Sequence, residues 1–236
     1  IDSDCLIHKF FLENAREFLK KYDCYGSFYQ PDPSQSWVSK VWLDVERKHD
    51  GLVSWVTSGT LAVTRRAFEE VLGFNEALQA EEDEDFCYRI RKNNGLIYND
   101  SKVASIHLGQ SDSIGEFFKK ESWRGKSLIK PKFSLVPFKF SLFDAVVLFY
   151  FFSIVCMIVF YNFTYIFCLG GLYIVIIPIL FSIRTTIITR KYSNFFKILF
   201  LYYVYFLARS WSIIQYKQWN NFFKKTGYPL RSSYFS

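Results

Sequence analysis

The stretch Glu81–Arg91, which reads EEDEDFCYRIR, places five adjacent carboxylates directly before apolar and basic residues. Acidic side chains favour the first turn of a helix, where unpaired N–H groups and the helix dipole offer partial positive charge. Phe86, Cys87 and Ile90 then supply a buried helical face. The pattern predicts a helix from Asp83 to about residue 93. Two interpretations of its acidic end stay open: a helix end stabilised by its dipole, or a carboxylate that enters a cleft as a general base.

Outward from this helix, strands and helices alternate through the first half of the chain. Apolar spacing predicts helices at 8–22, 34–45, 65–72 and 116–128, and strands at 25–29, 52–64, 96–98 and 103–107. This alternation predicts an α/β domain, in which ligands bind beyond the carboxyl ends of the strands. We expect four polar residues at such strand ends: Asp4, Ser58, Asp83 and His107.

Two acids stand close together at the start of the chain. Residues 1–4 are predicted to be the end of a buried strand that runs into a polar turn carrying Asp2 and Asp4. Carboxylates at this spacing can share a divalent cation with substrate phosphates. The alternative is an ordinary turn formed by Asp and Ser.

The charge of the chain is divided at about residue 141. Residues 1–141 hold 20 Lys/Arg and 21 Asp/Glu, whereas residues 142–236 hold 9 Lys/Arg and one acid. The near-neutral first part excludes a basic nucleic-acid surface, and no nucleic-acid partner is expected. The five cysteines form no C-x-x-C pair, so neither a zinc motif nor a disulfide framework is indicated, and a reducing compartment fits best.

The second part, 142–236, is predicted to be a membrane region. Residues 145–183 carry no charged side chain, and one helix of that length would be roughly 58 Å long, about twice the hydrocarbon thickness. We therefore predict helices at about 143–161 and 164–183, with a break near 161–164 or at Gly170-Gly171. A third segment, 195–214, is either a span or an interfacial helix.

The connection 184–197 carries four positive charges and no acid. This places it on the cytoplasmic side, together with residues 1–141, so the chain is predicted to be a multi-pass membrane protein with a cytoplasmic first part. The aromatic and basic tail, residues 219–231, suits an anionic lipid surface.

The order of the polar motifs in residues 1–127 resembles the second half of a family-2, GT-A-type inverting glycosyltransferase. The motifs are Asp2-Ser3-Asp4, TSGTLAVTRRAF at 57–68, GFNE at 73–76, EDEDFCYR at 82–89, and His107. The resemblance implies an incomplete GT-A domain at 1–141, followed by the helical membrane region at 142–236.

This resemblance implies a role for several residues. Asp4, with Asp2 nearby, would hold Mg²⁺ or Mn²⁺ against the diphosphate of a nucleotide-diphospho-sugar, and His107 would lie near the metal. Asp83 would be the base that deprotonates a glycan or lipid-linked acceptor. Four residues are assigned to the substrate pocket or to the tuning of the base: Ser58, Gly59, Glu82 and Asp85. Asp85 has the alternative of pairing with Arg89, and Arg124 either contacts the diphosphate or lies on a solvated helix face.

Two departures from the family pattern limit the expected activity. The half that binds the nucleotide normally precedes the Asp-x-Asp motif, so we expect this chain as given to lack full donor binding and activity. The Gln-x-x-Arg-Trp motif of processive synthases is replaced by ESWRG at 121–125, which favours transfer of single sugars. The alternative function is a non-enzymatic, membrane-anchored cation-binding or scaffold protein. The acidic stretch lacks the alternating acids and central glycine of an EF-hand, which counts against calcium binding.

Overall fold

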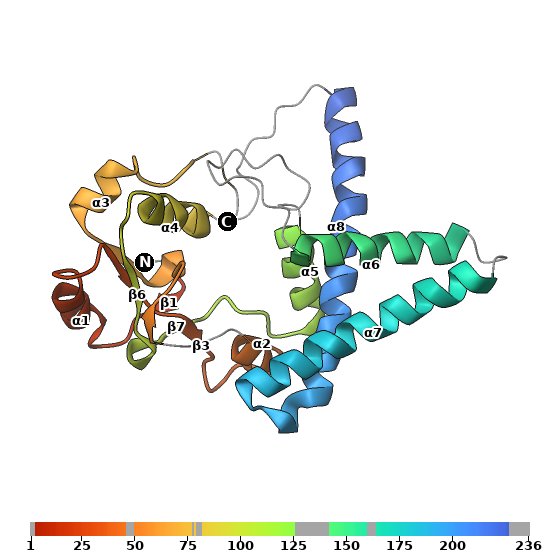
Figure 1. Cartoon of the computed structure of the whole chain (residues 1–236), viewed down its shortest axis with the longest axis horizontal. Coiled ribbons are helices and arrows are strands. Elements are labelled where there is room, and N and C mark those ends of the chain that lie inside the picture. The colour runs from red at the N-terminus through yellow and green to blue at the C-terminus, as the bar shows by residue number, and fades with distance from the viewer. Residues whose placement is uncertain are drawn as a thin grey trace.

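The computed structural model describes residues 3–45, 50–76, 78, 82–125, 142–159 and 164–226. The described residues between 3 and 125 form a mixed α/β unit, which we call the head. Three long helices form the rest, and they extend on the opposite side of the molecule from the small sheets (Figure 1). The predicted α/β class with apolar helices is thus confirmed, whereas the GT-A identity of the head stays a prediction.

The head contains two small mixed sheets. In the first, β7 (Ser105–His107) lies between β1 (Cys5–Leu6), to which it is antiparallel, and β3 (Tyr29–Gln30), to which it is parallel. The second has the order β4-β6-β2-β5, and its strands are β4 (Gly51–Leu52), β6 (Ile97–Asn99), β2 (Cys24–Gly26) and β5 (Leu61–Val63). In that sheet β2 is parallel to β6 and antiparallel to β5.

Five helices surround these sheets at the predicted places, with ends that differ from the predicted ones by up to four residues, and the predicted end of the last helix, at 126–128, lies outside the described residues. They are α1 (Phe11–Phe18), α2 (Trp37–Val45), α3 (Arg65–Glu70), α4 (Glu82–Lys92) and α5 (Ile114–Arg124). Side-chain caps set two of the starts: Thr64 accepts a hydrogen bond from Ala67 N, and Ser113 accepts one from Glu116 N. Gly73, with φ of +70°, lies in the turn after α3.

Three strand predictions need correction. The segment 25–29 divides into β2 and β3, which belong to different sheets. The segment 103–107 begins as the 3-10 helix η2 (Ser101–Val103), because the Asp100 side chain accepts a hydrogen bond from Lys102 N. At the start of the chain, Ser3 and Asp4 form a turn before β1, so the strand follows the acids. In this strand Cys5 pairs with His107 of β7, and the sequence gives no sign of this pairing because the two residues are far apart in the chain.

The expectation that polar site residues follow strands is therefore wrong for three of the four. His107 ends β7, but Asp4 precedes β1, Ser58 begins the 3-10 helix η1 (Ser58–Thr60), and Asp83 lies in α4. Asp4 still reaches the end of β7, because antiparallel pairing places Cys5 opposite His107.

A buried ion pair fastens α4 to the turn after α3. Asp85 is 2% exposed, and its Oδ2 accepts a hydrogen bond from Arg89 Nε at 2.8 Å. The Arg89 guanidinium also donates to the carbonyls of Val71 and Gly73. Because Phe74 stacks on Phe86 with ring centroids 4.4 Å apart, the GFNE and EDEDFCYR motifs form one packing unit.

The helical part, for which the sequence predicts a membrane region, consists of α6 (Leu142–Val159), α7 (Thr164–Thr189) and α8 (Phe195–Thr226). The break predicted near 161–164 falls mostly on residues outside the described part of the chain, whereas the alternative break at Gly170-Gly171 is wrong, because both glycines lie inside α7. Gly170 lies inside α7 and packs closely on Met157 of α6, which joins the two helices as a hairpin. Two segments in the described residues are long and apolar enough to cross a membrane: Gly170–Thr189 and Tyr192–Gln215.

Replacing Arg89 by methionine should destabilise the head by about 3–5 kcal/mol, because it leaves the buried Asp85 carboxylate without its cation. Urea unfolding of the full chain in detergent, followed by tryptophan fluorescence, measures this loss. Arg91→Met is the matched control, since Arg91 is exposed on the same helix. Equal destabilisation by the two variants would contradict a structural role for the Asp85–Arg89 pair.

Candidate functional site

Asp83 is held by backbone donors from two elements. Its Oδ1 accepts a hydrogen bond from Glu84 N at 2.8 Å, within the first turn of α4, and its Oδ2 accepts one from Ser58 N at 3.2 Å. These two bonds fix the carboxylate at the point where α4 meets η1. The structure thus places Asp83 beside the Ser58-Gly59 turn, and the catalytic and substrate-binding roles of these residues stay predictions.

The environment of Asp83 favours a proton acceptor that works near neutral pH. Burial raises the pKa of its carboxyl to about 6, and the nearby charge of Glu82 adds to that rise. The backbone donors at Glu84 and Ser58 oppose the rise only in part. A general base is most effective when its pKa lies near the working pH, and a pKa near 6 meets that requirement better than the ordinary value of about 3.9.

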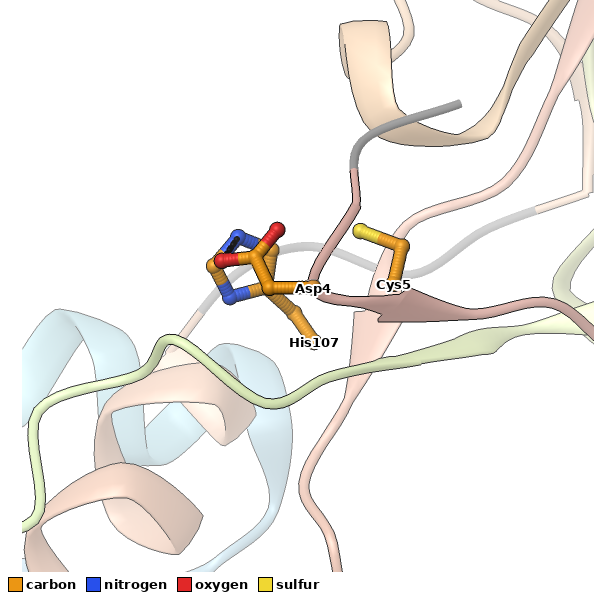
Figure 2. Close-up of side chains that lie close together, drawn as sticks. All are labelled: Asp4, Cys5 and His107. Carbon is orange, nitrogen blue, oxygen red and sulfur yellow. Dashed lines mark ion pairs between the residues drawn. The ribbon is translucent and has the colours of Figure 1, made fainter. Parts of the chain in front are cut away.

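The second cluster consists of Asp4, Cys5 and His107. One ligand atom from each side chain lies within 4.8 Å of the other two, and His107 Nε2 is 3.5 Å from Asp4 Oδ2. Figure 2 shows the Asp4 carboxylate beside the His107 imidazole, with the Cys5 sulfur directed toward the same side. The antiparallel register of β1 and β7 produces this arrangement, since it places the two strand ends next to each other.

The donor set of this cluster suits a borderline divalent cation. A carboxylate oxygen and an imidazole nitrogen are ligands that Mn²⁺ or Zn²⁺ accepts, whereas the Cys5 sulfur suits Zn²⁺ among these ions and Mg²⁺ prefers oxygen ligands alone. Asp4 and His107 fit a Mn²⁺ site, and the full set with Cys5 favours Zn²⁺ over the predicted Mg²⁺ or Mn²⁺. Asp2, the other predicted ligand, lies outside the described residues.

Neighbouring residues hold the cation cluster in place. The Tyr29 ring packs on His107 with centroids 4.7 Å apart, and Gln35 Nε2 donates to the His107 carbonyl at 3.0 Å. Gly109 passes so close to Asp4 Oδ2 and His107 Cε1 that a Cβ atom would clash with both. Lys120 of α5 donates to the Gly109 carbonyl at 2.7 Å, which places a positive charge beside the cluster.

Sequence reasoning missed Cys5 as a ligand, and it missed Gly109, Gln35 and Lys120. Cys5 could have been proposed as a ligand because it directly follows Asp4, and Gly109 could have been placed near the site because it lies two residues after His107. Nothing in the sequence indicates that Gln35 or Lys120 contacts this loop.

A three-residue segment connects the two clusters. The hydroxyls of Thr57 and Thr60, which flank Ser58, both donate to the buried Ser27 carbonyl. Two residues later, Tyr29 packs on His107. Two residue steps span at most about 7 Å. The same short piece of backbone, Ser27–Tyr29, therefore binds the turn that contacts Asp83 and also carries the Tyr29 ring that packs on His107.

The remaining predicted residues occupy different surroundings. Gly59 is buried inside η1, and Glu82 is half-buried next to Asp83. Asp85 forms an ion pair with Arg89, which is the alternative that the sequence left open for it. Arg124 contacts Glu121 at 2.7 Å, in the interface between α5 and α8, so this geometry gives no support to its predicted contact with a diphosphate.

Comparison of the chain with protein-family models gives no match. Comparisons with curated proteins and with solved structures give none either. Any functional assignment therefore depends on the residues and their geometry.

Titration with Co²⁺ should produce a sulfur-to-cobalt charge-transfer band in the near ultraviolet, because the proposed site offers a thiolate from Cys5. Cys5→Ser should abolish the band, and Cys156→Ser, which changes a half-buried cysteine of α6, should retain it. Persistence of the band in Cys5→Ser would exclude this cysteine from the cation site.

The same titration tests the role of Gly109. Gly109→Ala should weaken Co²⁺ binding at least tenfold, as expected when a residue that orients metal ligands is disturbed. Gly115→Ala is the matched control, since no atom lies closer than 4.0 Å to its added Cβ. Equal affinities in the two variants would contradict the proposed position of the site.

Proposed function

We propose that the protein is a membrane-anchored inverting glycosyltransferase of the GT-A type, which transfers a sugar from a nucleotide-diphospho-sugar to a hydroxyl of a glycan or lipid-linked acceptor. The observation that carries the proposal is the pairing of a carboxylate of raised pKa, Asp83, with an Asp-Cys-His cluster attached to the same backbone segment. The series of motifs in residues 1–127 supports it.

The chemistry of the reaction requires these two clusters to have different roles. A divalent cation at Asp4, Cys5 and His107 would supply positive charge to a leaving diphosphate. Lys120, whose ammonium is held at the Gly109 carbonyl, adds charge at the same place. Asp83 receives the proton of the acceptor hydroxyl, while the oxygen of that hydroxyl attacks the anomeric carbon from the face opposite the diphosphate. The two backbone bonds to Asp83 keep one carboxylate geometry through this step.

The membrane part of the proposal depends on the apolar helices. Gly170–Thr189 and Tyr192–Gln215 have the required length and composition, and the exposed side chains of the α6–α7 hairpin are large and apolar: Phe149, Phe152, Ile158, Leu172, Leu180 and Ile187. A cytoplasmic position for the head follows from the basic connection at 184–197.

The alternative is a non-enzymatic, membrane-anchored protein that binds a cation at Asp4, Cys5 and His107. The cluster by itself is consistent with this function. It leaves the raised pKa of Asp83 without a role, and for that reason we favour the enzyme.

Asp83→Asn should lower the rate of sugar transfer by at least 100-fold in the complete protein, because general-base catalysis contributes about 10²–10⁴ to such rates. Binding of the nucleotide-sugar, measured by calorimetry, should change little. Glu84→Gln, on the exposed neighbouring residue, serves as the control and should keep most of the activity. Transfer at the normal rate by Asp83→Asn would remove Asp83 from the base role.

The pH dependence of kcat/KM should show a limb that falls below a pH of about 6, since Asp83 must be ionised to accept a proton and its pKa is raised to about 6. A group with a raised acidic pKa loses its charge at a higher pH than an ordinary aspartate, so the limb lies above about 3.9. Glu82→Gln should move the limb to lower pH, because it removes a charge that raises the pKa of Asp83. A limb unchanged in this variant would contradict the assignment.

A further inference from the structure

One face of α8 is packed against the head along much of its apolar length. Trp42 of α2 contacts Tyr202 and Tyr205 with ring centroids 5.7 and 5.4 Å apart. Further along, Ser122 Oγ of α5 donates to the Ala208 carbonyl at 3.1 Å. Gly125 lies so close to Ser212 that a Cβ would clash with its hydroxyl. From Tyr202 to Ser212 these contacts cover about 15 Å of helix.

Ion pairs continue this interface. Glu121 of α5 is 1% exposed, and its carboxylate contacts Arg209 of α8 at 2.9 Å and Arg124 at 2.7 Å. Before α8 begins, Lys191 lies 3.5 Å from Asp44 of α2. The head therefore contacts the membrane region on both sides of the middle of the apolar segment Tyr192–Gln215.

These contacts are incompatible with a membrane-spanning α8. If Tyr192–Gln215 crossed the bilayer, its centre near Tyr203 would lie at the midplane, and α2 and α5 would lie there with it. Those helices carry charged side chains on their exposed faces, including Glu116 and Lys119. Each charge at the bilayer centre costs at least about 2.5–3.5 kcal/mol, whereas the same charges at the membrane surface remain in water.

The opposite face of α8 carries an exposed apolar stripe. It consists of Phe196 (80% exposed), Phe200 (45%), Leu207 (46%), Trp211 (45%) and Ile214 (38%). Phe200 lies at the edge of the stripe, since its ring also contacts Trp37 of α2 with centroids 6.4 Å apart. At 100° per residue these positions fall within a sector of about 60°. The buried residues Leu201, Tyr205 and Ser212 point the other way, toward the head.

The direction of the α6–α7 hairpin indicates which side of the molecule would face the lipid. Figure 1 shows α6 and α7 extending away from the head, while α8 runs across them. Contacts between Phe181 and Tyr202, and between Tyr150 and Phe206, fix this crossing. A hairpin that enters the bilayer in this direction leaves α8 lying along the bilayer surface.

We propose that α8 from Phe195 to Gln215 lies in the plane of the membrane, between the head and the lipid, with the apolar stripe inserted at the level of the headgroups and upper acyl chains. The lipid is favoured as the occupant because the stripe continues the exposed apolar surface of the hairpin. Lys197, exposed in the first turn of α8, adds attraction to anionic headgroups. The inference rests on the membrane attachment in the proposed function and is independent of sugar transfer.

The test measures the depth of nitroxide labels in the full chain, reconstituted in vesicles of phosphatidylcholine and phosphatidylglycerol. Labels are attached one at a time through a genetically encoded keto residue at Phe196, Leu207 and Ile214, which leaves the native cysteines in place. Depth is obtained from collisions with oxygen and with a water-soluble nickel chelate. The three labels should lie at one shallow depth, agreeing within about 5 Å, because an in-plane helix buries its apolar face about 5–10 Å deep.

The matched control places labels at Leu172, Leu180 and Ile187, which are exposed on α7. If α7 crosses the bilayer, Leu180, near the centre of the apolar segment Gly170–Thr189, should lie about 10 Å deeper than Leu172 and Ile187. For α8, a Leu207 label that lies about 10 Å or more deeper than the labels at Phe196 and Ile214 would establish a span and overturn the proposal. Full access of the α8 labels to the nickel chelate, or spin–spin broadening between copies, would overturn it as well. Equal depths along α7 would count against the membrane hairpin alone, because the α8 labels decide the present proposal by themselves.

Discussion

The buried carbonyl of Ser27 is the constraint on which the candidate site depends. It accepts hydrogen bonds from the Thr57 and Thr60 hydroxyls, so the turn carrying Ser58 is fixed to the backbone that leaves β2. That backbone then enters β3 and packs Tyr29 on His107. Loss of both donors would leave a buried carbonyl without these hydrogen bonds and would lower the free energy of unfolding. The Ser27–Tyr29 segment therefore holds the turn beside Asp83 and the ring beside His107 in fixed positions.

The three long helices are also fixed rigidly to the head. Tyr205 and Phe206 of α8 belong to a core cluster that also contains Val38 of α2 and Phe117 of α5. The head and the helices thus share one hydrophobic core in addition to the ion pairs around Glu121. In the proposed arrangement, a head fixed in this way would keep a constant height above the lipid surface, which would suit the proposed transfer to a lipid-linked acceptor.

Local signals predicted the helices well and the long-range contacts poorly. Apolar spacing located α2, α4 and α5, and the uncharged run located the hairpin. The spacing of side chains cannot show that Cys5 pairs with His107, because that register depends on two strands of two and three residues. It also cannot show that Glu121 is buried by Arg209, since the partner is 88 residues away. Asp83 was found because its motif is local, whereas Lys120 and Gly109 join the site only through folding.

The central claim is that a cation at Asp4, Cys5 and His107 and the carboxylate of Asp83 act on the same donor molecule. Anomalous diffraction from crystals of the complete protein grown with Mn²⁺ and a nucleotide-sugar tests this most directly. One Mn²⁺ peak ligated by Asp4 and His107 is expected, with the diphosphate on that ion and the anomeric carbon facing Asp83. A Mn²⁺ peak elsewhere, or a donor sugar directed away from Asp83, would contradict it.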